Sequence, residues 1–490
     1  MTIELDPTRP SVRRGADPEP TLPTDQVVAT QQEVSSREQQ SWQALQAQVT
    51  GRLVTPADPD WDLERTPWIV NIDQHPAAIL HCADEADVQV AVRWAVEHGR
   101  SVTAQPRGHA ARTALDGALM LRTRNLQAIQ IDLDRRTARV GAGVKFGELM
   151  AQLDGTGLTA LCGSNADPSV VGLSLGGGVS WFTRKYGFTA NSVVSFDVVD
   201  ARGERVVVDR DSDPDLFWAL RGGGGDFAIV LAVELALFPA PELYAGQLLW
   251  PVEHAPAVLR AFRDLALVAP RELTVWAHLC HYPPMPDIPE PIRGRSFVTV
   301  ATTYLGSPTA AEALLATLRQ AAPVEIDLLG PLPISRLGDV AAEPTEPTPV
   351  MEHSMLLDSL DDDAIDALVE TTGDPTSCPL MIVQIRGLGG AFAERTAADG
   401  AVEAVDASFN LWAGGIPVVP EVAAAIPHAF AAIDQAVGRL STGHRMPNFS
   451  GAAQGNSAGY APGTLFRLRQ LKQTRDPRRV IRSNKPVLGQ

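Results

Sequence analysis

Gly172-Leu-Ser-Leu-Gly176-Gly177-Gly178 is a glycine cluster that follows Arg107-Gly-His109 by about sixty residues. A third cluster, Arg221-Gly-Gly-Gly-Gly225, comes later, and all three stand at the ends of apolar runs. Because glycine has no Cβ, backbone amides at such positions can approach a pyrophosphate closely. The pattern indicates a pyrophosphate-containing cofactor, and the lone His109 stands where a flavin ring could be reached.

Length and composition set the broad class. The chain has 490 residues, 45% hydrophobic and 20% charged, which predicts two or three globular folding units. The net charge of −17 argues against nucleic acid or an anionic membrane surface as a partner. We see no run near the ~18 apolar residues that a membrane span requires. A small-molecule substrate is therefore expected, and the oligomeric state stays open.

The cysteines and the N-terminal region bear on the compartment. Cys82, Cys162, Cys280 and Cys378 are widely spread and form no CxxC pair, so neither a disulfide framework nor a zinc site is expected. Residues 1–40 are polar, which predicts a disordered tail. Arg13-Arg14 has no hydrophobic segment behind it, so an export signal is not expected. These features together predict a cytoplasmic protein.

The first globular part opens with a β-α-β pattern. Strands are predicted at Ile79–Cys82 and Ser101–Ala104, around a helix Glu85–His98 that Asp84 caps and Gly99 ends. This is the opening expected of a cofactor-binding domain. Further predicted elements are strands Leu119–Leu121, Ile129–Asp132 and Ala138–Val140, a helix Phe146–Leu153, and a hairpin of Val193–Val199 with Glu204–Val208.

After Phe238-Pro-Ala-Pro241 long Ala/Leu helices alternate with single strands, which predicts a second α+β unit. Asp361-Asp362-Asp363 opens one of the helices, where carboxylates favour the positive end of the dipole, so we interpret it as a cap and expect no metal site. The predicted helices are Ala255–Val268, Thr309–Ala321, Asp361–Thr371 and Pro420–Gly438, and the predicted strands are Leu273–His281, Phe297–Tyr304, Leu380–Arg386 and Ala407–Trp412.

From about Trp68 to Val487 the chain resembles the FAD-linked oxidases of the berberine-bridge-enzyme type, including bacterial natural-product flavoenzymes. The resemblance rests on many ordered matches: Arg65-Thr-Pro-Trp68, Gln105-Pro-Arg-Gly-His109, Gly172–Gly178, Arg184-Lys-Tyr-Gly187, Asp213-Pro-Asp-Leu-Phe-Trp218, Arg221–Phe227, Asn448-Phe449, Tyr460, Lys472, Asp476-Pro477 and Arg482-Ser-Asn484.

The resemblance implies an α+β fold with a PCMH-type (vanillyl-alcohol-oxidase-like) FAD-binding domain of two α+β subdomains. It also implies a substrate domain with an antiparallel sheet flanked by helices. The expected boundaries are 41–241 for the FAD domain, 242–440 for the substrate domain and 441–490 for a segment that returns to the FAD domain. A Rossmann fold is the competing idea. Gly141-Ala-Gly143-Val-Lys-Phe-Gly147 has one residue too many for that fingerprint and lacks the following acidic strand end.

In this family the histidine of the motif is joined to the flavin 8α-carbon, and some members add a cysteinyl bond. His109 matches the histidine, whereas the cysteine position falls on Asn165. Cys162 lies three residues away and would need a different loop path. FAD attached through His109 alone is therefore expected, and an ordinary loop histidine or non-covalent FAD stays open. Arg107 replaces the usual glycine, where its charge would disfavour a protonated His109 or simply form a surface ion pair.

The resemblance also implies a set of FAD contacts along the chain. They are Arg107, Gly108, His109, Ala110, Asn165, Ser169, Val170, Gly172, Gly176, Gly177, Tyr186, Gly187, Asn191, Ile229, Asn448 and Asn484.

The substrate side lacks the family's usual proton acceptor. Relatives use a Glu or Tyr on the substrate-domain sheet or before the Asn-Phe motif, and these places hold Asn410, Gln384 and Met446. Period-two alternation puts His278 on one face of its strand with Trp276 and Cys280. We predict His278 as the base, with Asn410 and Tyr460 as further catalytic candidates. A purely structural role for His278 or Tyr460 is the alternative.

The sequence thus favours an FAD-dependent oxidase that takes a hydride from an alcohol or activated C–H of a small natural product. Oxygen would reoxidise the flavin and give hydrogen peroxide. The alternatives are a flavin-dependent oxygenating or rearranging enzyme acting on a polyketide-like intermediate, and a flavin-bound protein without turnover.

Overall fold

The computed structural model describes residues 37–451 and 456–489. The chain forms two units, residues 1–47 and residues 48–490. In the first unit residues 37–46 are helical, so the expected disordered tail does not extend over residues 37–40; residues 1–36 lie outside the described residues. Everything that follows concerns the second unit.

A four-stranded sheet opens the second unit, in the order β1 (Arg52–Val54), β2 (Ala78–His81), β4 (Leu119–Arg122) and β3 (Val102–Ala104). Both β2 and β3 run parallel to β4. The helix α3 (Glu85–Glu97) joins β2 to β3, and the Asp84 side chain accepts hydrogen bonds from two amides of its first turn. The predicted β-α-β opening is confirmed.

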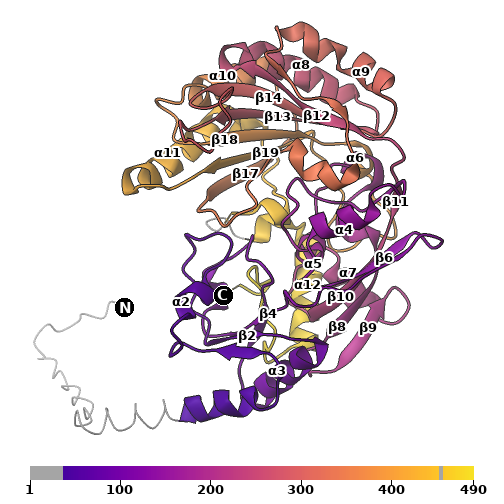
Figure 1. The fold of residues 1–490 in the computed structure, drawn as a ribbon, viewed down its shortest axis with the longest axis vertical. Coiled ribbons are helices and arrows are strands. Elements are labelled where there is room, and N and C mark those ends of the chain that lie inside the picture. The colour runs from indigo at the N-terminus through magenta and orange to yellow at the C-terminus, as the bar shows by residue number, and fades with distance from the viewer. Residues whose placement is uncertain (1–36, 452–455, 490) are drawn as a thin grey trace, which may run out of the picture. The chain divides into compact units, whose positions relative to one another are not determined.

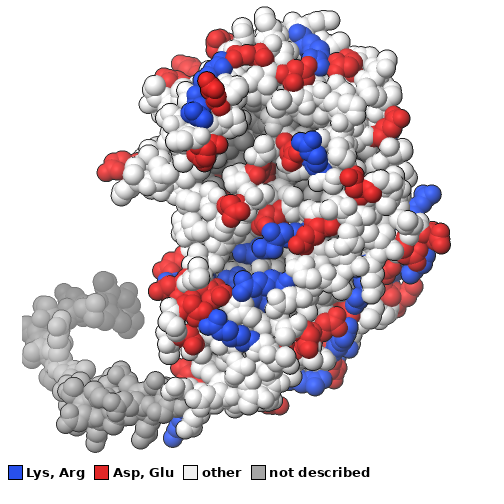
Figure 2. Space-filling view, in the orientation of Figure 1, with Lys and Arg blue, Asp and Glu red and all other residues white. Residues whose placement is uncertain are grey.

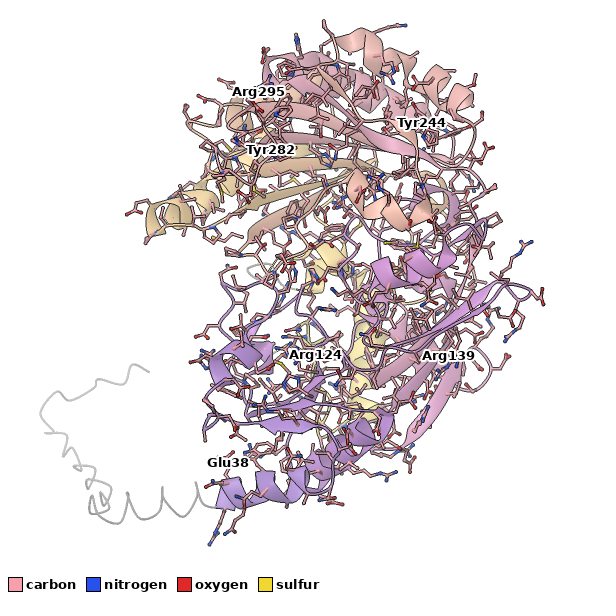
Figure 3. All side chains as sticks on the ribbon, viewed as in Figure 1. Glu38, Arg124, Arg139, Tyr244, Tyr282 and Arg295 are labelled. Atoms are coloured by element: carbon pink, nitrogen blue, oxygen red, sulfur yellow. The ribbon has the colours of Figure 1, made fainter. Side chains whose placement is uncertain are left out.

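A five-stranded antiparallel sheet follows, in the order β5 (Ile129–Asp132), β6 (Thr137–Gly141), β10 (Ile229–Ala236), β8 (Val193–Val199) and β9 (Arg205–Asp209). The predicted hairpin is the pair β8–β9. Figure 3 shows Arg139 on β6, where its guanidinium binds the Asp197 carboxylate of β8 at 2.7 Å. Short elements complete this part: α4 (Phe146–Leu153), β7 (Leu158–Thr159), α5 (Val170–Leu175), α6 (Thr183–Tyr186), α7 (Pro214–Leu220) and β11 (Phe238–Pro239).

The strands of the second half join in one antiparallel sheet with the main order β12, β14, β13, β18, β19, β17. Short strands β15 (Ile326–Asp327) and β16 (Gly330–Pro331) pair with β12. Two of the long strands, β12 (Tyr244–Pro251) and β17 (Met351–Leu357), were not predicted. The others are β13 (Leu273–His281), β14 (Ser296–Tyr304), β18 (Ile382–Gly387) and β19 (Phe409–Gly415).

Four helices pack on one face of this large sheet: α8 (Ala255–Val268), α9 (Pro308–Ala321), α10 (Asp362–Thr372) and α11 (Pro420–Val437) (Figure 1). Alternate strand residues such as Val275, Val383 and Leu411 enter the core beneath the helices. The opposite face therefore carries the residues between them, many of them polar and buried. The Asp361 side chain caps α10 through the Ala364 amide, as predicted.

The C-terminal segment lies against the first half of the unit. The helix α12 (Pro462–Arg475) forms ion pairs from Arg467 to Asp215 and from Arg475 to Asp213, both on or beside α7. Ile481 bridges to Val102 of β3. Basic and acidic side chains are interspersed over the face in Figure 2. None of the helices in the described part combines the length and apolar character needed to cross a bilayer.

Candidate active site

His109 has a hydrogen-bond partner at one ring nitrogen and an aromatic ring stacked on one face. Its Nε2 lies 2.8 Å from Asp167 Oδ2, and the ring stacks on Trp68 with 4.3 Å between centroids. The other Asp167 oxygen is 2.6 Å from Lys145 Nζ. Burial alone would raise the pKa of Asp167, but the hydrogen bonds from His109 and Lys145 outweigh it and lower that pKa to about 2. The carboxylate is therefore ionised and its two oxygens are both occupied.

The loop that carries Asp167 also contains Asn165, which matches the family's cysteine position. Asn165 Nδ2 donates to the Pro344 carbonyl at 2.7 Å, and its Oδ1 accepts from the Asp167 amide. Cys162 is buried at 1% exposure, and burial raises the pKa of its thiol to about 12. A thiol with such a pKa is a poor nucleophile near neutral pH, because the thiolate is the reactive form.

The turn at residues 107–110 holds His109 in place. Gly108 has φ +100°, and a Cβ there would lie 2.7 Å from Pro67 Cβ, so the position requires glycine. The Arg107 carbonyl accepts from the Trp68 amide at 3.1 Å. Arg107 Nε is buried without a hydrogen-bond partner among the described residues. The turn therefore presents one unsatisfied buried donor next to His109.

The glycine cluster is packed against the C-terminal segment. Gly178 N donates to Asn448 Oδ1 at 2.7 Å, and a Cβ at Gly176 would lie 2.4 Å from Asn448 Nδ2. Gly177 has φ +104°, and its Cβ would meet Val402 Cγ2 at 3.0 Å. The sequence predicted glycines here for access to a pyrophosphate. In the structure the amides of Gly176, Gly177 and Gly178 instead donate to oxygens of Leu173, Ser174 and Asn448, and the glycines are required by close packing around Asn448.

The first turn of α5 connects this cluster with the His109 side. The Ser169 side chain accepts from the Gly172 amide at 3.1 Å, and the Val170 amide donates to the Val144 carbonyl. The backbone of Ser169 also forms an isolated β-bridge with that of Lys145, the residue whose side chain binds Asp167. The predicted contacts Ser169, Val170 and Gly172 therefore lie on one continuous path from the glycine cluster to His109.

Asn484 ties the chain end to the same region. Its Oδ1 accepts from the Arg112 amide at 2.9 Å, and its Nδ2 donates to Gln105 Oε1 at 3.0 Å. Arg112 in turn contacts the Ser450 carbonyl, two residues after Asn448. Residues that are far apart in sequence therefore meet around the His109 turn.

His278 lies on the large sheet in a row of buried polar side chains that also contains Thr299, Gln384 and Arg386. Its Nδ1 contacts Thr299 Oγ1 at 3.0 Å, and its Nε2 lies 2.8 Å from Gln384 Nε2. Since Gln384 Oε1 accepts from Arg386 Nε, the Gln384 amide donates to His278 and leaves Nδ1–H to donate to Thr299. Burial, and then the positive charge of Arg386, lowers the pKa of His278 to about 3.

Arg386 links the sheet to the loop before Asn165. Its guanidinium lies 4.0 Å from the Trp276 ring centroid and 4.5 Å from that of Phe449, and it donates to Ser164 Oγ at 3.3 Å. Burial lowers its pKa to about 10, so it stays charged near neutral pH. Asn410, directly opposite Arg386 on β19, has 0% exposure, and both of its amide atoms lack a hydrogen-bond partner among the described residues.

Glu352 is a carboxylate on the same face that the sequence reasoning missed. It lies on β17, and Trp412 Nε1 donates to its Oε2 at 2.9 Å. Burial raises the pKa of Glu352, against the opposing effects of the Trp412 hydrogen bond and the nearby charges of Lys485 and Arg112. The missed signal was the alternation in Met351–Leu357, in which Met355 and Leu357 face the core and Glu352 and Ser354 do not.

The other predicted site residues lie apart from the His109 turn. Tyr460 donates from its hydroxyl to the Gly222 carbonyl at 2.9 Å, and burial raises its pKa. Tyr186 donates to the Pro239 carbonyl, and Asn191 binds Asp399 and the Gly400 amide. Ile229 is buried at the start of β10. Gly187 has φ +84° and faces open space, so a ligand could approach it. Among residues 37–451 and 456–489 no interaction brings these five residues to His109.

The residues around His109 fit an FAD. The Arg107 Nε and the Asn410 amide are buried polar atoms without partners in the described residues, which are the groups a polar ligand would satisfy. His109, the 107–110 turn and the Asn448-bound glycine cluster would hold it. In the described residues no group of acidic, histidine or cysteine side chains could hold a metal ion.

Part of the chain matches a known protein family. Residues 76–209 match the family described as "FAD binding domain". The chain is 32% identical to (R)-6-hydroxynicotine oxidase of Paenarthrobacter nicotinovorans over 43% of this chain and 46% of that protein. It spans about half the length of the curated relatives it matches.

Two solved structures show the extent of the shared fold. Physcomitrella patens BBE-like 1 superposes with a TM-score of 0.80 at 18% identity, over 91% of this chain and 98% of that one. A glucooligosaccharide oxidase of Acremonium strictum, whose structure is described as revealing a novel flavinylation, gives a TM-score of 0.77 at 22% identity over 91% and 98% of the two chains. The predicted α+β, PCMH-type fold is confirmed.

Proposed function

We propose that this chain, which carries the FAD-binding domain and the fold of the FAD-linked oxidases of the berberine-bridge-enzyme type, is an FAD-dependent oxidoreductase. Its substrate is an alcohol or an activated C–H compound among small natural products. Bound FAD supplies the hydride acceptor, and dioxygen takes the electrons on to give hydrogen peroxide. The observation that carries the proposal is the buried polar face of the large sheet, which meets the His109 side through Arg386 and Ser164.

FAD is held covalently through His109 alone. The support is that Asn165 stands at the cysteine position and that the Cys162 thiol is buried with a raised pKa. After acid precipitation the protein should stay yellow, and the tryptic peptide with His109 should carry the mass of FAD. Flavin that washes entirely into the supernatant would disprove covalent attachment.

Two residues on the sheet are candidates for the proton acceptor. His278 was predicted from sequence, but both of its ring nitrogens are engaged and its pKa is about 3. Glu352 is a carboxylate whose pKa is raised, and a general base works best with a pKa near the working pH. We assign proton transfer to Glu352 and the orientation of the buried row to His278. Asn410 offers its unpaired amide to the substrate or to the flavin.

The decisive experiment is anaerobic flavin reduction. The purified holoprotein is mixed with 6-hydroxynicotine, gluco-oligosaccharides, and a set of aromatic and polyketide-type alcohols, and the loss of the flavin's visible absorbance is recorded. The first two probes are chosen because a 6-hydroxynicotine oxidase and a glucooligosaccharide oxidase are similar to this chain. Bleaching by at least one compound is expected. Failure of the whole panel would favour a flavin-bound protein without turnover.

Admission of air then separates the remaining alternatives. An oxidase releases one hydrogen peroxide for each substrate oxidised. An oxygenating or rearranging enzyme instead places an atom of labelled dioxygen in the product, which mass spectrometry detects. Release of peroxide without label in the product is the expected result.

A further inference from the structure

The three side chains His109, Asp167 and Lys145 form a connected row whose role is not explained by FAD binding alone. Asp167 Oδ2 is 2.8 Å from His109 Nε2, and Asp167 Oδ1 is 2.6 Å from Lys145 Nζ. The Asp167 side chain has only 5% exposure, although it lies on a loop. A buried carboxylate with a cation on one oxygen and a histidine on the other is held in a single orientation.

The charge state of Asp167 fixes the tautomer of His109. An ionised carboxylate can only accept hydrogen bonds, so the hydrogen in the 2.8 Å contact must belong to His109 Nε2. In the neutral imidazole the lone pair then lies on Nδ1. Nδ1 has no partner among the described residues, and the Trp68 ring fixes the plane of the imidazole.

We propose that Asp167 is a positioning residue for flavin attachment, which directs the bond to Nδ1 of His109 and keeps Nε2 as the proton donor. The inference rests on the proposed covalent link to His109. It goes beyond that link because it names the residue that selects the bonding nitrogen.

Attachment of His109 to the flavin is a two-electron oxidation of the 8α-carbon. His109 Nδ1 forms a bond to the flavin 8α-carbon while one C–H bond of that carbon breaks. The two electrons of the C–H bond reduce the flavin, which takes up the proton released from the 8α-carbon, while His109 keeps the hydrogen on Nε2 and its ring becomes positively charged. Dioxygen then reoxidises the flavin and becomes hydrogen peroxide. Asp167, bound to Nε2, stands where it can stabilise the positive charge that bonding places on the imidazole ring.

Asp167→Asn tests the role of the carboxylate. Lys145 would donate to the amide oxygen, so the amide nitrogen would face His109 and donate to Nε2, which moves the hydrogen to Nδ1 and removes the nucleophile. We expect total FAD binding to persist while the rate of covalent attachment falls at least about tenfold. Asp167→Glu keeps the carboxylate and should recover part of that rate.

Glu148→Gln is the matched control, because Glu148 Oε2 accepts from the Lys145 amide but does not touch Asp167. It should leave the covalent fraction unchanged. Each full-length protein is purified, supplied with FAD in air, and sampled over time for acid-stable and acid-released flavin. Nuclear magnetic resonance of the purified flavin peptide identifies the substituted ring nitrogen.

The outcomes separate this inference from the proposed function. Wild type without any covalent flavin would refute the covalent link itself. A wild-type protein whose flavin is attached to Nε2 would refute the role of Asp167 alone. So would an Asp167→Asn protein that attaches FAD at the normal rate. Loss of all bound flavin in both Asp167 variants would show that the residue is merely structural and would also overturn the proposal.

Discussion

The two sides of the candidate active site hold their histidines in opposite ways. His109 has one nitrogen on an ionised carboxylate, the other without a described partner, and 22% side-chain exposure. His278 has both nitrogens hydrogen-bonded to neutral groups and 3% exposure. An imidazole with one available nitrogen can form a bond without losing a contact. An imidazole with two occupied nitrogens must first break a hydrogen bond, so its position suits orientation rather than reaction.

The largest expected effect concerns FAD retention and compares two glycines with positive φ. Gly177→Val should abolish retention, because its Cβ would lie 3.0 Å from Val402 and displace the loop from Asn448. At Gly187 an added Cβ meets no protein atom within 4 Å. Gly187→Val should strain the backbone, because φ +84° disfavours a side chain, but it should keep more FAD than Gly177→Val. Flavin content after gel filtration measures both.

Normal flavin content in Gly177→Val would show that this loop does not hold the phosphate. Loss of FAD in Gly187→Val, at unchanged thermal stability, would identify Gly187 as a ligand contact, because its protein surroundings are open.

The second comparison concerns the two proton-acceptor candidates on the sheet face. With any compound that bleaches the flavin, Glu352→Gln should slow anaerobic reduction by roughly 10²-fold, the usual loss for a general base. His278→Gln should slow it by about tenfold or less, because a glutamine can keep a hydrogen bond in the row. Both variants should bind FAD like wild type.

If His278→Gln slowed flavin reduction more than Glu352→Gln, His278 would be the general base, as the sequence predicted. Unchanged rates in both variants would point to a substrate acidic enough to need no base, or to Tyr460.

Acid should remove the stability contributed by His278 and that contributed by Asp167 over different pH ranges. The pKa of His278 is about 3 in the folded protein against an ordinary 6.5, so the unfolded chain binds more protons and stability falls as pH drops between these values. The loss is on the order of a few kcal/mol. Asp167, with a pKa of about 2 against an ordinary 3.8, contributes stability that is lost only below about pH 4.

Urea unfolding at a series of pH values measures these windows. His278→Gln should flatten the decline between pH 6.5 and 4, whereas Asp167→Asn should leave it and change only the region below about pH 4. His281 also has a lowered pKa and contributes to the same upper window, so the His278 contribution is the difference between variant and wild type. No difference between them above pH 4 would contradict the buried, neutral state of His278.

The smallest expected effect is at Cys162. Cys162→Ala should leave the flavin peptide and the covalent fraction unchanged, because the thiol is buried and the loop presents Asn165 instead. The cost is a modest loss of stability, about 1 kcal/mol, from a small buried side chain. Mass spectrometry of the flavin peptide checks it, and any loss of covalent flavin would show that the loop adopts another path.

The elements that the sequence predicted well have strong local signals. Asp84 caps α3, which ends at Glu97, one residue before the predicted His98. The predicted limits of α8 and β13 are correct. The motif around His109 and the glycine cluster likewise pointed to FAD and to the shared fold. Such features depend on residues within a few positions of one another, so a single sequence contains them.

Other features exist only because distant segments meet. Asp167 and Lys145 bind each other across a loop, and neither was singled out beforehand. Glu352 was missed with its strand β17, whose pairing with β19 decides which side chains share the polar face. The low pKa of His278 arises from burial and from Arg386, which lies 108 positions later in the sequence. Sequence alone determined which groups the chain carries; tertiary packing decided their partners, their burial and therefore their charge.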